Sequence, residues 1–213
     1  DHDHDHDADA ERHAREAVTL NEALARANAR FQPELGRSSD NLGLILARQG
    51  RHAEAIPHAM RAVRVYAEAA QLHREADQAR ASVEVADNGP RKTGVPRYQP
   101  EHAAALTNLG VCLSELGRHA EALPLAEKAV RICAELAKLT ELTESDRDRY
   151  RRQYARALDN LAVDLSALRR HPDAERRRQD AYKIRLGLGD VGPARQRWWP
   201  VRAPTPAKQA LGR

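Results

Sequence analysis

Histidine, aspartate and cysteine are the residues of this 213-residue chain whose chemistry could support catalysis or metal binding. The N-terminal segment alternates two metal-ligating types, as DHDHDHDAD over residues 1–9, and could bind a divalent ion loosely. Such a tract has no apolar partner against which to bury itself. We therefore expect residues 1–10 to form a disordered His/Asp-rich segment, and we predict no metal site.

Three histidines, His52, His119 and His171, occupy the same position in recurring sequence surroundings. This recurrence indicates duplication, and it favours a structural role beside a turn over catalysis. Cys112 and Cys133 replace core-type residues, so we expect buried, reduced thiols. The chain has no glycine-rich phosphate loop, nucleophile elbow, paired-cysteine motif or His-Glu metal helix. We predict no catalytic residues and no cofactor, and therefore no enzyme.

The elements that position these residues are copies of one helical hairpin. In the best-preserved copy, residues 105–139, apolar residues recur at helical spacing up to Gly117 and again from Leu123. This pattern predicts two helices joined by a tight turn. An Asn-Leu-Gly or Asn-Leu-Ala triplet marks the first helix of each copy and begins at Asn41, Asn108 and Asn160.

This pattern resembles the tetratricopeptide repeat (TPR) family, and it is similar to TPR arrays of actinobacterial signalling and regulatory proteins. The residues that carry the resemblance in the middle copy are Leu109, Gly110, Leu113, Gly117, Ala122 and Ala129. The resemblance implies an all-α fold, a TPR-like α-solenoid of antiparallel helix hairpins wound as a right-handed superhelix.

Glycines at two repeated positions suit such hairpins. Gly43 and Gly110 have no Cβ and would let the partner helix approach closely, while Gly50 and Gly117 can adopt the left-handed conformation that closes a helix. The third copy departs from this pattern, because Ala162 and Arg169 stand at the two positions.

We expect four segments along the chain. They are the disordered residues 1–10, a helix over 11–30 left from a preceding repeat, a TPR-like array over 31–188 with units from 31, 98 and 150, and a flexible Pro/Arg/Trp tail over 189–213. The helix over 11–30 leaves an apolar end, which predicts either upstream repeats of a larger parent protein or self-association. Trp198 and Trp199 in the tail could cap the last hairpin or anchor in a partner.

The resemblance also implies a function, because first helices of TPR proteins line a concave groove that holds a peptide or a partner helix. An asparagine before the Leu-Gly pair often grips the peptide backbone there, since its amide both donates and accepts. The same residue could instead satisfy groups between repeats. The residues of this chain that match the groove positions are Asn41, Asn108, Asn160, Arg37, Arg48, Thr107, Glu115, Arg156 and Asp159.

We therefore predict a scaffold or regulatory protein-protein interaction module, whose partner is a protein, a peptide or another domain of its parent. Residues 145–213 hold seventeen Lys and Arg against eight Asp and Glu, which keeps open nucleic-acid binding through the Arg-rich C-terminal half. Arginine beside acidic residues is more often plain surface, so nucleic acid is disfavoured. A structural spacer or oligomerisation module is the other alternative. No apolar run is long enough to cross a membrane and nothing resembles a signal peptide, so we expect a cytoplasmic protein without membrane contact.

Overall fold

The computed structural model describes residues 2–84, 96–139 and 142–189, and every regular element in these ranges is a helix. The all-α prediction is confirmed. The elements are α1 (His2–Ala27), the short 3-10 helix η1 (Ala29–Phe31), α2 (Gln32–Arg48), α3 (His52–Glu84), α4 (Gln99–Glu115), α5 (His119–Ala137), α6 (Glu144–Ala167) and α7 (His171–Gly187).

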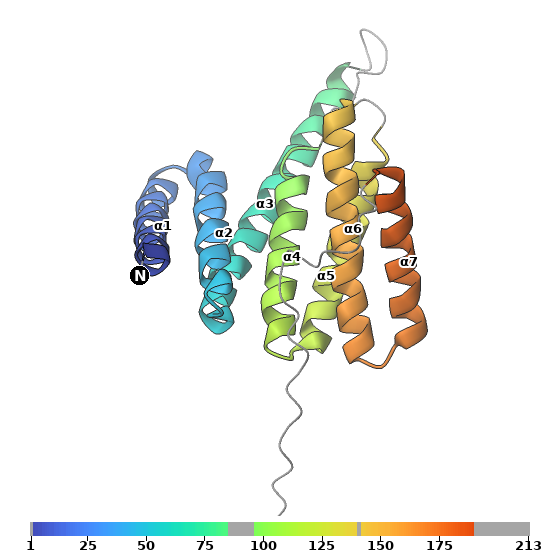
Figure 1. Cartoon of the computed structure of the whole chain (residues 1–213). Coiled ribbons are helices and arrows are strands. Elements are labelled where there is room, and N and C mark those ends of the chain that lie inside the picture. The colour runs from blue at the N-terminus through green and yellow to red at the C-terminus, as the bar shows by residue number, and fades with distance from the viewer. Residues whose placement is uncertain (1, 85–95, 140–141, 190–213) are drawn as a thin grey trace, which may run out of the picture.

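The helices pack as hairpins in chain order. α2 pairs with α3, α4 with α5 and α6 with α7, and each second helix also contacts the first helix of the next hairpin. Figure 1 shows α1 at one end of this array and α7 at the other. The first helices α2, α4 and α6 contact one another in sequence, so they form one continuous wall. No helix in the described ranges is long and apolar enough to span a membrane.

The starts of four helices follow from the sequence. Pro33, Pro100 and Pro172 stand in the first turns of α2, α4 and α7, where a missing backbone N–H breaks no helical hydrogen bond. α6 instead begins after Thr143, whose hydroxyl oxygen accepts a hydrogen bond from the backbone N–H of Asp146 at 3.1 Å. The first helix of the third unit therefore starts six residues earlier than the boundary predicted at 150.

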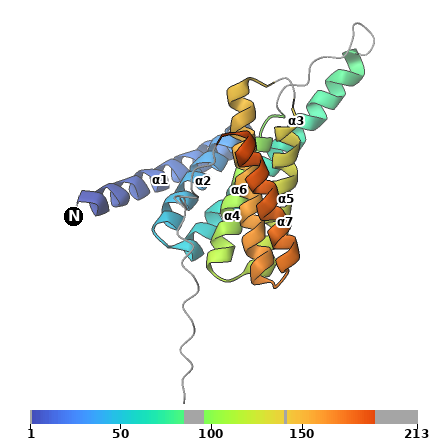
Figure 2. The same ribbon diagram turned by 45° about the vertical axis from the view of Figure 1, so that its right-hand side comes forward.

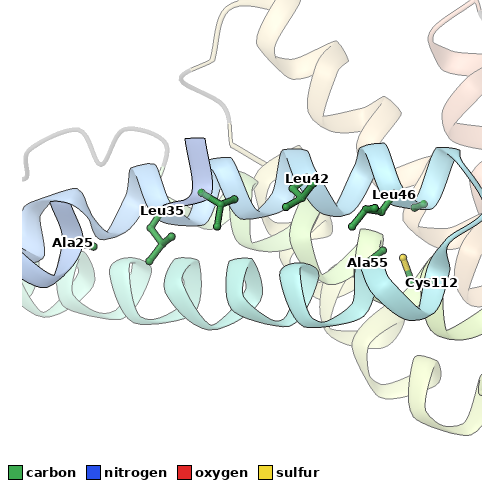
Figure 3. Packing of buried hydrophobic residues seen from close by; sticks show 8 residues of the cluster. Ala25, Leu35, Leu42, Leu46, Ala55 and Cys112 are labelled. Atoms are coloured by element: carbon green, nitrogen blue, oxygen red, sulfur yellow. The ribbon is translucent and has the colours of Figure 1, made fainter. Parts of the chain in front are cut away.

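Buried aliphatic residues and alanines hold the hairpins together. Leu42 and Leu46 of α2 are 1% and 0% exposed and cluster with Ala55 of α3 and Cys112 of α4 (Figure 3). Cys112 and Cys133 are both buried and form no disulfide, as predicted. Burial raises the pKa of the two thiols to about 11 and about 12.

All three hairpins close with the same turn. Gly50, Gly117 and Arg169 have φ values of 77°, 74° and 60°. In the first turn, the N–H of Arg51 donates to the carbonyl oxygen of Leu46 at 2.9 Å, and the other two turns repeat this bond at 2.9 and 2.7 Å. These bonds define a helix-ending motif whose left-handed residue is usually glycine. Arg169 adopts the same left-handed conformation although it has a Cβ, and the resulting steric strain destabilises the folded chain by roughly 1–2 kcal/mol.

Replacing Arg169 with glycine should therefore stabilise the chain. We expect Arg169→Gly to raise the free energy of unfolding by about 1 kcal/mol, measured by urea denaturation, because the left-handed strain is relieved. The matched change Gly117→Ala should lower the free energy of unfolding by a similar amount. If both substitutions raised the free energy of unfolding, or both lowered it, this account of the turns would be contradicted.

The glycines of the Leu-Gly pairs are not needed for close approach, so that expectation was wrong. A Cβ on Gly43 would lie 3.5 Å from the carbonyl oxygen of Ala55, and one on Gly110 would lie 4.0 Å from that of Ala122. Both distances are ordinary van der Waals contacts. Ala162 in the third copy accordingly fits at the same position with 0% exposure.

The N-terminal helix begins earlier than predicted. α1 starts at His2, so the prediction of disorder over residues 1–10 is wrong for residues 2–10. Val18 and Ala25 of α1 are buried in the cluster that involves α2, which anchors the helix over the range predicted for 11–30. Acidic residues near a helix N-terminus are favourable with the helix dipole, and Asp7 also lies 3.8 Å from Arg48. The predicted tail, including Trp198 and Trp199, lies outside the described residues.

Candidate partner-binding surface

Three of the predicted binding residues lie together in a cleft between α1 and α2. Arg37, Asn41 and Arg48 are exposed along α2, one or two turns apart. They line a cleft of about 480 Å³ whose other wall is α1. The remaining residues of the cleft are the acidic Glu34 and the uncharged residues Ala14, Ala17, Asn21, Ser38, Leu44 and Ile45.

Asn108, at the equivalent position of α4, is engaged within the array. Its side-chain nitrogen donates a hydrogen bond to a carboxylate oxygen of Asp40 at 2.9 Å. Asp40 belongs to α2, so this bond joins two neighbouring first helices. Burial raises the pKa of Asp40, although the hydrogen bond from Asn108 acts in the opposite direction. Asn108 therefore serves the junction between two units.

The asparagines at the two ends of the wall differ from Asn108 in their surroundings. Asn41 on α2 is exposed, and Asn160 on α6 is half-buried. Among the described residues, the hydrogen bonds of the array include none to either of these two amides. Their donor and acceptor groups are therefore the ones that could bind a partner's backbone.

The other predicted residues fall into two groups. Thr107 is buried and its hydroxyl donates to the carbonyl oxygen of Ala103 at 2.9 Å, so it does not belong to an accessible surface. Asp159 forms an ion pair with Arg185 of α7. Glu115 and Arg156 are exposed on α4 and α6. The structure thus gathers Arg37, Asn41 and Arg48, and it places Glu115, Arg156 and Asn160 further along the same wall.

A buried carboxylate joins the second and third units. Asp164 of α6 is 1% exposed, and its Oδ1 accepts a hydrogen bond from the Ser114 hydroxyl at 2.5 Å and lies 3.0 Å from Nδ1 of His119. The three residue types are those of a hydrolase triad, but here serine and histidine are both held by the carboxylate. A catalytic serine needs histidine as its own hydrogen-bonded base. The cluster is therefore a junction between units.

Burial dominates the electrostatics of this junction. It raises the pKa of Asp164 above the usual 3.8, even though the hydrogen bonds from Ser114 and His119 act to lower it. The folded chain consequently holds a proton on Asp164 more tightly than the unfolded chain does. The contribution of Asp164 to the free energy of unfolding therefore falls as pH rises from 3.8 through its folded pKa.

An Asp164→Asn variant should reveal this pH dependence, because asparagine retains the acceptor oxygen and cannot ionise. We expect its free energy of unfolding, relative to the unsubstituted chain, to increase as pH rises from about 4 to about 7. Urea denaturation across this range measures the difference. The control Glu127→Gln removes an exposed carboxylate and should show no such trend. A difference for Asp164→Asn that stays flat or falls with pH would contradict the assigned pKa shift.

Arginines of the C-terminal half are mostly engaged with carboxylates. Arg170 and Arg176 both lie within 3.0 Å of Asp173, and Arg177 lies 3.9 Å from Asp180. Arg149 and Arg151 of α6 pair with acidic residues one turn away in the same manner. Each pair is exposed and weak, but together they occupy many of the arginines that could otherwise contact phosphates.

Sequence reasoning missed the residues that join one element to another. The α1 wall of the cleft, the bond from Asn108 to Asp40 and the cluster around Asp164 all depend on the register between helices. One signal was present, because Asp164 stands where the other two copies have Ile45 and Cys112. A charged residue at an apolar repeat position indicates a special contact.

The tetratricopeptide repeat family model matches residues 36–77 and 102–138, which fall in the first two hairpins. A search of curated proteins found no match. Two similar solved structures are described as nearly identical TPR-like repeats of a kinesin light chain from Podosopora anserina. One of these two structures is of a single-substitution variant. The variant has 19% identity and a TM-score of 0.30, over 88% of this chain and 94% of that one.

The unsubstituted form has 18% identity and a TM-score of 0.29, over 87% and 94% of the two chains. A third similar structure is BtubC (BKLC) from P. vanneervenii, with 12% identity and a TM-score of 0.24 over 93% and 98%. At these values the three structures carry no argument about what this chain binds.

Proposed function

Because this chain carries tetratricopeptide repeats, we propose that it is a non-catalytic module that holds a protein partner on the wall formed by α2, α4 and α6. We call the partner-facing part of this wall the first-helix surface. It consists of Arg37, Asn41, Leu44, Arg48, Glu115, Arg156 and Asn160.

One observation carries this proposal. The three first helices are neighbours, and the first and last of them present the same pair of residue types at the same repeat positions. Arg37 and Asn41 on α2 correspond to Arg156 and Asn160 on α6, with one helical turn between arginine and asparagine in each pair. None of these four side chains is fully buried. Such a repeated pair suits a ligand that runs along the wall.

The chemistry of the pair indicates how the partner would be held. An asparagine amide can donate to a carbonyl or carboxylate oxygen of the partner and accept from one of its N–H groups at once. The neighbouring arginine can bind a carboxylate with two parallel hydrogen bonds. The partner segment therefore has acidic residues near both ends, one opposite Arg37 and one opposite Arg156.

The alternatives have less support. Nucleic-acid phosphates would have to compete with Asp173, Asp180 and the other carboxylates that already pair with the C-terminal arginines. A pure spacer would not need an arginine and an asparagine repeated on one face. The two buried thiols suit a reducing compartment, so we place this interaction in the cytoplasm.

Charge reversal on the first-helix surface tests the proposal. The double variant Arg37→Glu, Arg156→Glu should bind the partner at least about tenfold more weakly, a loss of about 1.4 kcal/mol. Affinity capture from source-cell lysate, followed by titration of the purified partner, measures the loss. The matched control Arg64→Glu, Arg131→Glu makes the same charge change at exposed positions of α3 and α5 and should bind normally.

Circular dichroism must first show that both variants are as helical as the unsubstituted chain. Equal retention of the partner by both variants would overturn the assignment of the surface. If no protein is retained even by the unsubstituted chain, the spacer alternative is favoured. A salt-sensitive shift of random DNA or RNA at low salt would instead favour the nucleic-acid alternative.

A further inference from the structure

α1 corresponds to the second helix of a hairpin. Its Ala17-Val18 pair is in phase with Ala62-Val63 of α3 and Ala129-Val130 of α5. Val18 is 6% exposed and belongs to the cluster with α2 residues, just as Val63 packs in the cluster with α4 residues. α1 therefore covers α2 in the way that α3 covers α4.

The other side of α1 has no partner helix among the described residues. In α3, Val65 is 4% exposed because it packs against Gly36 of α2, the first helix of its own hairpin. The residue of α1 in the same phase is Leu20, which is 62% exposed. α1 packs on η1 and α2 and reaches α3 through ion pairs such as Glu22 with Arg61. Figure 2 shows it projecting at one end of the array.

The cleft between α1 and α2 lies where a first helix would complete this hairpin. Within the array, each first helix packs on its own second helix and on the next first helix, as α2 does on α3 and α4. A helix related in the same way to α1 and α2 would occupy the cleft lined by Ala14, Ala17 and Asn21 on one side and by Asn41 on the other.

The contact between α2 and α4 predicts the chemistry of the missing helix. There, Asp40 of the earlier first helix accepts a hydrogen bond from Asn108. Asn41 is the counterpart of Asn108 and is exposed, so the helix in the cleft should bring a carboxylate to it. Arg37 and Arg48 also line the cleft, together with the acidic Glu34, and Asp7 lies 3.8 Å from Arg48. Arg37, one turn from Asn41, is exposed and would favour a second carboxylate on the same face of the helix.

We propose that the cleft between α1 and α2 binds an amphipathic α-helix of a partner protein, which packs as the first helix of the hairpin whose second helix is α1. The helix has a small residue opposite Leu20, apolar side chains toward α1 and a carboxylate opposite Asn41. This inference deepens the proposed function, because it states what kind of partner segment the N-terminal end of the first-helix surface takes.

A synthetic peptide of residues 31–49 is a suitable probe, because it carries the α2 sequence that already packs in this way on α3. Labelled with a fluorophore and titrated with the purified chain, it should bind saturably as judged by fluorescence anisotropy. Its Gly36 would meet Leu20 and its Asp40 would meet Asn41. A peptide carrying Asp40→Ala should bind several-fold more weakly.

Matched substitutions in the chain locate the binding site. Leu20→Glu should weaken peptide binding at least about tenfold, whereas Leu72→Glu changes an equally exposed leucine of α3, 66% against 62%, and should have no effect. Both positions are exposed, so both variants should fold. Absence of peptide binding, or equal effects of the two substitutions, would overturn the inference.

Sedimentation velocity of the chain alone distinguishes a partner helix from a second copy. A monomer at the concentrations of the titration supports the inference. A dimer that Leu20→Glu abolishes would overturn it in favour of self-association. The peptide titration uses no cellular partner, and Arg156 does not contribute to the cleft. If the peptide does not bind, the charge-reversal test of the first-helix surface can therefore still give a positive result.

Discussion

The close approach of two helices within each hairpin is the constraint on which the structure depends. An alanine stands at this crossing in every copy, and Ala55, Ala122 and Ala174 are each 0% exposed. A larger side chain there would separate the helices or force strained rotamers, which costs typically 1–3 kcal/mol in a packed core. Figure 3 shows Ala55 in the cluster with Leu46 and Cys112, where α2 meets its neighbouring helices.

Local features of the fold could be predicted from the sequence because each depends on a few adjacent residues. The hairpins, the left-handed turns at Gly50 and Gly117 and the burial of the cysteines were all of this kind. Contacts between units could not be predicted, since they depend on how far one helix is shifted along another. Asn108 illustrates the limit, because its residue type suits both peptide binding and the bond to Asp40, and only the relative position of α2 and α4 selects the second.

Equivalent polar residues of different units serve either the surface or the interior. The repeat position of Asn108 is used for cohesion, while Asn41 and Asn160 stand at the two ends of the wall without that contact. Asp164 also serves the interior. Its carboxylate contacts Ser114 and His119 and so joins two units, although burying a carboxylate is unfavourable. Polar residues at the junctions thus fix how the hairpins are stacked, and the stacking in turn places Arg37, Asn41, Arg156 and Asn160 along one wall.

The side-chain amide signals of the three asparagines in a ¹H–¹⁵N spectrum test the central claim most directly. On addition of the captured partner, the signals of Asn41 and Asn160 should shift, whereas the signal of Asn108 should stay in place because its amide is already bound to Asp40. A spectrum in which Asn108 shifts as much as the other two would contradict the account. Unchanged signals from Asn41 and Asn160 in a saturated complex would also contradict it.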